Sequence, residues 1–183
     1  LTMLRVILVP VFMVFAALSN YGTAGYNETF MLLAGIVFAA ASFTDFLDGY
    51  LARKYHLVTD FGKFMDPLAD KCLTTAAFIY MVADGICSPV VLAVILFREF
   101  AVAGVRMIAA ESGTVIAANI WGKVKTVLQM LTILFYYFAA ALGSPSDVLG
   151  VGLVTMALTW LVAAVTLLSG GIYLWQNRPC FLQ

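Results

Sequence analysis

Six long apolar stretches, separated by short polar breaks, restrict what this sequence can fold into. They cover roughly residues 2–19, 29–54, 61–84, 88–111, 120–142 and 147–176. A helix that crosses a bilayer needs about 20 mostly apolar residues, and each stretch approaches or exceeds that length. The breaks carry turn-forming residues such as Asp84-Gly85 and Gly143-Ser144-Pro145. The pattern predicts an all-α integral membrane protein, a bundle of six transmembrane helices forming a single domain over residues 1–183.

The composition favours a membrane protein over a soluble one. The chain is 63% hydrophobic and 11% charged, with a mean hydropathy of +1.01, whereas soluble domains are about half apolar and a quarter charged. An unusually apolar soluble helical protein is the alternative, but a chain of 183 residues cannot bury so much apolar surface in one core. The formal net charge of zero gives no general attraction to nucleic acid.

The first apolar stretch has a second interpretation, as a signal peptide. Near its start, Arg5 precedes an apolar run that ends in Ala16-Ala17-Leu18-Ser19. Everything downstream is equally apolar, so we favour a transmembrane helix. Because the sequence begins at Leu1 rather than Met, we also expect that a few natural N-terminal residues are missing.

The ten Lys and Arg residues indicate an orientation. If the N-terminus is cytoplasmic, the outer connections are 20–28, 85–88 and 143–146, and these contain no Lys or Arg. All ten then lie at or toward the cytoplasmic half, as the positive-inside rule requires. We therefore expect a multi-pass membrane protein with both termini cytoplasmic. The form of the chain suggests a bacterial plasma membrane.

Four aspartates surround the connection between the second and third stretches. Asp45 and Asp48 are three residues apart, and Asp66 and Asp70 are four apart, so each pair projects from one face of its helix. A short connection makes these helices antiparallel neighbours, and all four carboxylates can converge at the cytoplasmic end. Carboxylates with no nearby His or Cys suit Mg²⁺ or Mn²⁺, and two such ions about 4 Å apart would clamp a phosphoryl group in transfer.

Small residues accompany the aspartates. Gly49, Ala52 and Gly62 allow close approach of either a second helix or a ligand. In isolation we would favour helix packing for Gly49 and Ala52. Beside four aspartates and Arg53, we favour a ligand pocket.

The full pattern Asp45-x2-Asp48-Gly49-x2-Ala52-Arg53-x8-Gly62-x3-Asp66-x3-Asp70 resembles the signature of the CDP-alcohol phosphotransferase family, with no departure. The resemblance implies six transmembrane helices, a homodimer and two divalent cations, Mg²⁺ or Mn²⁺. It further implies that Asp45, Asp48 and Asp66 are metal ligands and that Asp70 both contacts metal and acts as general base. The residues implied to line the CDP site are Asp48, Gly49, Ala52, Arg53 and Gly62.

Three further segments resemble the phosphatidylglycerophosphate synthase branch of this family: Leu1–Arg5, Phe97–Arg106 and Gly122–Thr126. This narrower resemblance implies phosphatidyl transfer from CDP-diacylglycerol, a membrane lipid, to glycerol 3-phosphate by direct displacement, with release of CMP. The last apolar stretch, by contrast, has no distinctive feature. Thr2 and Arg5 are weaker candidates for contact with the nucleotide or the acceptor.

A phosphorylated acceptor needs cations, and four basic residues near the facing ends of the fourth and fifth stretches offer them: Arg98, Arg106, Lys123 and Lys125. Inositol phosphate or another phosphorylated polyol would use such a cradle equally well. For Glu99, beside Arg98, we favour a role in neutralising or orienting a cation. Snorkelling to the interface is a plausible alternative for Arg106 and Lys123.

A membrane carrier is the alternative from a different functional class, because clustered intramembrane Asp and Arg residues could form a cation or proton pathway. A pathway predicts ionisable residues spread across the membrane depth. Here they gather toward one face, so the sequence favours an enzyme whose active site lies at the cytoplasmic face.

Overall fold

The computed structural model describes residues 2–19, 25–55, 60–111, 120–142 and 148–178, with side chains described for 7–19, 25–44, 71–107, 109, 120–142 and 150–178. These residues form six α-helices: α1 Thr2–Ser19, α2 Glu28–Tyr55, α3 Asp60–Ala83, α4 Pro89–Glu111, α5 Ile120–Leu142 and α6 Val148–Gln176. The six predicted helical stretches are confirmed, each boundary to within one residue.

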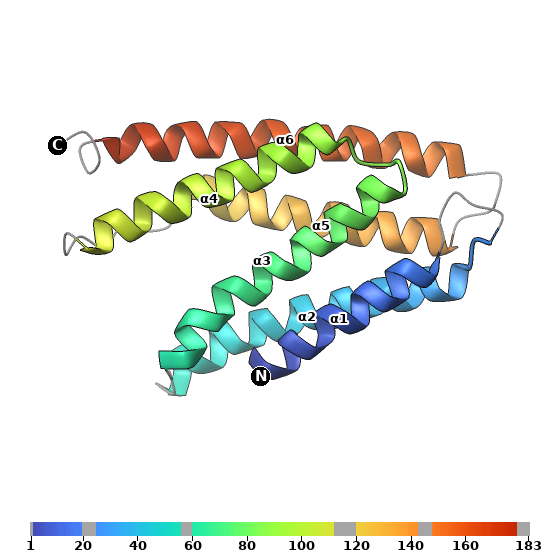
Figure 1. Ribbon diagram of the computed structural model, residues 1–183, viewed down its shortest axis with the longest axis horizontal. Helices are drawn as coiled ribbons and strands as arrows, with labels where there is room; N and C mark the ends of the chain where they lie inside the picture. Colours follow the sequence, from blue (N-terminus) through green and yellow to red (C-terminus); the bar gives the residue numbers. More distant parts are fainter. Residues whose placement is uncertain (1, 20–24, 56–59, 112–119, 143–147, 179–183) are drawn as a thin grey trace.

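The helices run lengthwise along an elongated bundle (Figure 1). α1 packs on α2 and α3, α5 packs on both α2 and α6, and α4 packs mainly on α6. In Figure 1, α4 and α6 lie together at the top while α1 and α2 lie together at the bottom. α5 therefore links two groups of helices, and α4 depends on α6 for much of its support.

Aromatic side chains form the centre of the larger hydrophobic core. Phe12 of α1, Phe38 of α2 and Tyr137 of α5 are almost completely buried. The ring of Phe12 lies 5.9 Å from that of Phe38 and 5.4 Å from that of Tyr137, measured between centroids, and tilted or edge-on contacts of this kind are favourable. These three rings hold α1, α2 and α5 together.

A glycine allows the close approach of α2 and α5. A Cβ placed on Gly35 of α2 would lie 3.1 Å from the Cβ of Tyr137, which is tighter than ordinary van der Waals contact. Because Gly35 has no side chain, α2 can pack this closely against Tyr137 in the aromatic core.

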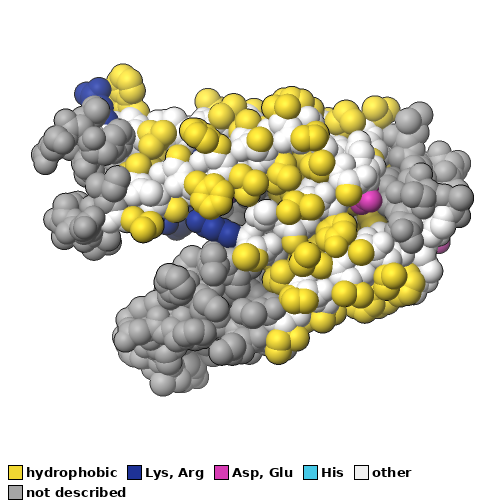
Figure 2. All heavy atoms as spheres, viewed as in Figure 1, with side chains coloured by type: hydrophobic (Ala, Val, Ile, Leu, Met, Phe, Trp, Pro, Cys, Tyr) yellow, Lys and Arg dark blue, Asp and Glu magenta, His cyan; other side chains and the backbone are white. Residues whose placement is uncertain are grey.

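Two helices are long and apolar enough to cross a membrane, judged by length and composition among the residues whose side chains are described. They are Ile120–Leu142 and Gly150–Gln176, with mean hydropathies of 1.4 and 2.2. Only 28% of the most apolar 18 residues of Gly150–Gln176 is buried, so this helix does not resemble the core helix of a soluble protein. Apolar side chains also cover much of the face in Figure 2, as lipid contact requires.

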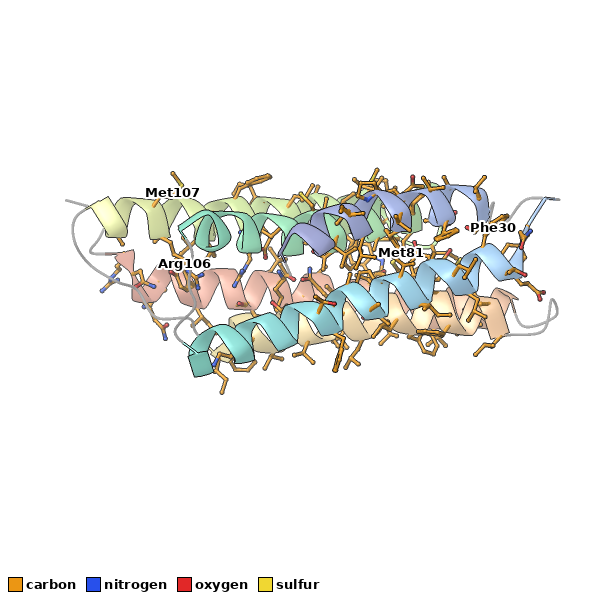
Figure 3. All side chains as sticks on the ribbon, turned by 90° about the horizontal axis from the view of Figure 1, so that it is seen from below. Phe30, Met81, Arg106 and Met107 are labelled. Carbon is orange, nitrogen blue, oxygen red and sulfur yellow. The ribbon has the colours of Figure 1, made fainter. Side chains whose placement is uncertain are left out.

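The two ends of the bundle differ in charge. Figure 3 shows Arg106 and Met107 near one end and Phe30 near the other, with Met81 between them. On the face in Figure 2, Lys and Arg side chains lie toward one end and Asp and Glu toward the other. On this face, the Lys and Arg side chains therefore lie toward one end, in line with the charge asymmetry expected from the sequence.

Candidate active site

The signature aspartates lie on the expected helices. Asp45 and Asp48 belong to α2, and Asp66 and Asp70 belong to α3. The two helices contact each other, and Figure 1 shows the end of α2 beside the beginning of α3. The side chains of all four lie outside the described part of the chain, so their convergence stays a prediction.

The other predicted residues of the nucleotide site have the same status. Gly49, Ala52 and Arg53 belong to α2, and Gly62 belongs to α3. Thr2 and Arg5 belong to the first turns of α1. The helical spacing on which the predictions depend is confirmed, while the contacts of these side chains fall outside the described residues.

Glu99 of α4 is the centre of a cluster of charges from three helices. One of its carboxylate oxygens, Oε1, accepts hydrogen bonds from Lys125 Nζ and from Arg98 Nη1, the latter at 3.2 Å. The other, Oε2, lies 3.6 Å from Lys71 Nζ. Lys125 is 4% exposed and Glu99 18%. The prediction that Glu99 neutralises cations is confirmed, and three cations against one carboxylate leave a net positive charge.

Arg98 lies in the interior rather than snorkelling to the surface, with its side chain 11% exposed. Its Nη2 donates a hydrogen bond to Ser169 Oγ of α6 at 2.8 Å. Its Nε is buried and has no hydrogen-bond partner among the described residues. An unsatisfied donor on a buried cation is costly and is a feature expected of a ligand site.

Arg106 and Lys123 are placed apart from the Glu99 cluster. Arg106 Nε donates to the hydroxyl of Tyr173 at 3.2 Å, and Lys123 is exposed. Within the described side chains, neither forms an ion pair with Glu99. Of the four predicted phosphate-binding cations, the structure therefore brings Arg98 and Lys125 together at Glu99. It adds Lys71, which the sequence analysis had not assigned.

A pocket of about 530 Å³ opens beside the cluster. Its polar end is formed by Lys71, Glu99 and Lys125, and much of its wall is apolar, including Met13 and Phe100. Figure 2 shows Lys and Arg side chains at the floor of a hollow. A site with a cationic end and apolar walls suits an anionic group that reacts at a lipid surface.

Three α6 residues near the arginines, Ser169, Gly170 and Tyr173, were missed by the sequence analysis. They carry no charge and belong to no recognised motif, so a local pattern gives no signal for them. Their position beside Arg98 and Arg106 arises from the packing of α4 on α6, about 70 residues apart in sequence.

Comparisons with known proteins agree with the resemblance. Residues 1–168 match the family described as CDP-alcohol phosphatidyltransferase. A Bacillus subtilis protein named CDP-diacylglycerol–glycerol-3-phosphate 3-phosphatidyltransferase is 38% identical, across 97% of this chain and 92% of the relative. A Rickettsia felis protein of the same name is 36% identical, across 94% and 90%. A probable phosphatidylglycerophosphate synthase of Mycobacterium tuberculosis is 37% identical, across 91% and 75%. The chain belongs to the CDP-alcohol phosphatidyltransferase family.

Proposed function

We propose that this protein transfers the phosphatidyl group of CDP-diacylglycerol to glycerol 3-phosphate, giving phosphatidylglycerol phosphate and CMP. Relatives that carry this activity in their names align over nearly the whole chain. The structural observation that supports the acceptor assignment is the buried cluster around Glu99, in which Lys71, Arg98 and Lys125 outnumber the single carboxylate.

In the proposed reaction, Asp70 removes the proton from the 1-hydroxyl of glycerol 3-phosphate. The resulting oxygen attacks the phosphorus that carries diacylglycerol, and the bond from that phosphorus to the CMP oxygen breaks. CMP leaves with the electron pair of that bond. We expect no covalent enzyme intermediate, because the sequence offers no Ser, Cys or His nucleophile arrangement.

Asp45, Asp48, Asp66 and Asp70 would hold two divalent cations. Their all-oxygen donor set fits Mg²⁺ or Mn²⁺, and their positions on two contacting helices are compatible with a shared site. Bound cations supply charge stabilisation at the diphosphate as the leaving group departs. Asp48, Gly49, Ala52, Arg53 and Gly62 would contact the CDP portion.

The acceptor phosphate would bind in the cationic pocket. Arg98 and Lys125 meet at Glu99, and Arg106 and Lys123 would extend the positive region toward the cytoplasmic end. Thr2 and Arg5 are further candidate contacts. Lys71 directly follows Asp70 on α3, so the proposed base is next in sequence to a residue of the acceptor pocket.

The membrane arrangement is part of the proposal. Six transmembrane helices with both termini cytoplasmic, in a bacterial plasma membrane, would place the active site at the inner face. The support is the six long helices and the separation of charge in Figure 2. CDP-diacylglycerol would then reach the site sideways from the inner leaflet with its acyl chains in lipid. We also propose a homodimer, on the family resemblance.

A phosphorylated polyol such as inositol phosphate is the alternative acceptor, because the same cations would bind its phosphate. A carrier function is disfavoured by membership of an enzyme family. The test is CMP release by the purified protein with CDP-diacylglycerol and Mg²⁺ or Mn²⁺. Glycerol 3-phosphate, inositol phosphate, serine and no acceptor would be compared.

Release with glycerol 3-phosphate alone, abolished by Asp70→Asn, would support both the reaction and the base. Release with a different acceptor would overturn the acceptor assignment. Folded, metal-supplied protein that releases no CMP with any acceptor would contradict the enzyme proposal.

A further inference from the structure

The two arginines of α4 both form hydrogen bonds to α6. Arg98 and Arg106 are eight residues apart, about two helical turns, on the side of α4 that packs against α6. Arg98 bonds Ser169 and Arg106 bonds Tyr173. Between them, Val102 and Val105 pack with Tyr173 in a small second core.

Ser169 fixes the direction of the Arg98 guanidinium. Its side chain is fully buried, and its Oγ accepts from Arg98 Nη2 at 2.8 Å. Glu99 accepts from the other terminal nitrogen, Nη1, at 3.2 Å. A planar guanidinium held at both terminal nitrogens has a defined orientation.

Gly170 provides the space through which the Arg98 side chain passes. A Cβ built on Gly170 would lie 2.9 Å from Arg98 Cγ and 3.8 Å from its Cβ. The nearer distance is shorter than real Cβ contacts allow, and the atom it meets is near the root of the side chain rather than its flexible tip. On the α5 side, a Cβ on Gly122 would lie 3.4 Å from Arg98 Nη2. Two glycines thus border the arginine from different helices.

Tyr173 holds Arg106 in a comparable way. The tyrosine is 2% exposed, its hydroxyl accepts from Arg106 Nε at 3.2 Å, and the guanidinium carbon lies 5.7 Å from its ring centroid. A hydrogen bond and a cation–π contact from one buried residue restrict an otherwise exposed arginine.

We infer that Ser169, Gly170 and Tyr173 of α6 are positioning residues for the acceptor phosphate, acting through Arg98 and Arg106. This inference rests on the proposed function of the cationic pocket. It assigns a role in acceptor affinity to the helix that carries no signature residue. Among the described residues, Ser169, Gly170 and Tyr173 lie against the arginines of α4, so we expect their loss to affect the acceptor rather than the chemical step.

The experiment compares two adjacent glycines. Gly170→Ala introduces the clash with Arg98. A Cβ on Gly171 would meet nothing within 4 Å in the described part of the chain, so Gly171→Ala is the matched control. Steady-state CMP release would be measured with glycerol 3-phosphate and CDP-diacylglycerol varied separately. Gly170→Ala is expected to raise the KM for glycerol 3-phosphate by roughly three- to tenfold. Its kcat and the KM for CDP-diacylglycerol should stay within about twofold of the control.

Ser169→Ala and Tyr173→Phe test the same inference without adding volume. Each removes one hydrogen-bond acceptor, and each should raise the KM for glycerol 3-phosphate by roughly two- to fivefold at unchanged kcat. If Gly170→Ala fails to fold, these two variants decide the question. A general structural role would instead lower kcat and thermal stability together and leave the KM values unchanged.

Arg98→Ala separates failure of the inference from failure of the proposed pocket. Suppose that Arg98→Ala raises the KM for glycerol 3-phosphate, but that this KM is the same for Gly170→Ala as for Gly171→Ala and the same for Ser169→Ala and Tyr173→Phe as for wild type. Then α6 has no positioning role and the inference is overturned. If Arg98→Ala itself leaves that KM unchanged, the proposed acceptor pocket is wrong and the inference falls with it.

Discussion

Lys125 of α5 and Glu99 of α4 form an ion pair in the interior of the bundle, and the same carboxylate also meets Arg98 and Lys71. Removing one partner of a buried pair leaves an uncompensated charge in a medium of low dielectric. Glu99 is therefore the residue that allows three cations to gather beside the pocket, which Lys71 and Lys125 line.

Glu99→Gln should destabilise the protein, because Lys71, Arg98 and Lys125 would repel one another without the carboxylate. The expected loss is on the order of 3 kcal/mol, measured as a lower thermal midpoint in detergent. The double variant Glu99→Gln/Lys125→Met should recover part of that loss. Equal midpoints for Glu99→Gln and wild type would show that the Glu99 carboxylate does not stabilise the protein by offsetting repulsion among the three cations.

Asp84 should make stability depend on pH. It lies just beyond the end of α3 and accepts a hydrogen bond from Tyr136 at 2.7 Å. Burial raises the pKa of its carboxyl from 3.8 to about 6, although the Tyr136 hydrogen bond lowers it. The raised pKa means that folding favours the protonated form. The stabilisation of the folded state by protonated Asp84 is fully present below pH 3.8 and is lost as the pH rises through about 6.

Asp84→Asn should accordingly raise the thermal midpoint at pH 7.5, because the amide is neutral and its oxygen still accepts from Tyr136. We expect a gain of a few degrees that disappears near pH 4, obtained from paired melting curves of variant and wild type. A difference between the two that is independent of pH would contradict this account of Asp84.

Gly35→Ala should weaken the aromatic core. The added Cβ would lie 3.1 Å from the Cβ of Tyr137, and overpacking of this kind costs about 1–3 kcal/mol. Gly104→Ala is the control, since a Cβ there would lie within 4 Å of none of the described residues. The thermal midpoint should fall for the first variant only, and similar midpoints for both would mean that α2 and α5 separate without cost.

The helices could be predicted closely from the sequence, whereas the pocket could not. Apolar runs and turn residues such as Gly85 fix helix ends locally, which explains why each boundary agrees to within one residue. Glu99 could be assigned to neutralise a cation because Arg98 is its neighbour in sequence. Lys71 and Lys125 reach Glu99 only through helix packing, which a single sequence does not reveal. Ser169 and Gly170 carry no chemical signal until α6 is placed against α4.

Metal removal and Asp70 should affect activity in different ways. Chelation should abolish CMP release, and added Mg²⁺ or Mn²⁺ should restore it. Asp70→Asn should lower kcat by about 10²–10⁴-fold, the usual contribution of a general base, and excess metal should not restore it. Recovery of the activity of Asp70→Asn at high metal concentration would mean that Asp70 acts only as a metal ligand and not as the base.

The most direct test of the central claim is the identity of the lipid product, determined by mass spectrometry after incubation with CDP-diacylglycerol, glycerol 3-phosphate and Mg²⁺. Attack at the phosphorus that bears diacylglycerol predicts phosphatidylglycerol phosphate together with an equal amount of CMP. Formation of phosphatidic acid together with CMP esterified to the 1-oxygen of glycerol 3-phosphate would mean attack at the other phosphorus. That result would contradict phosphatidyl transfer as the function of this protein.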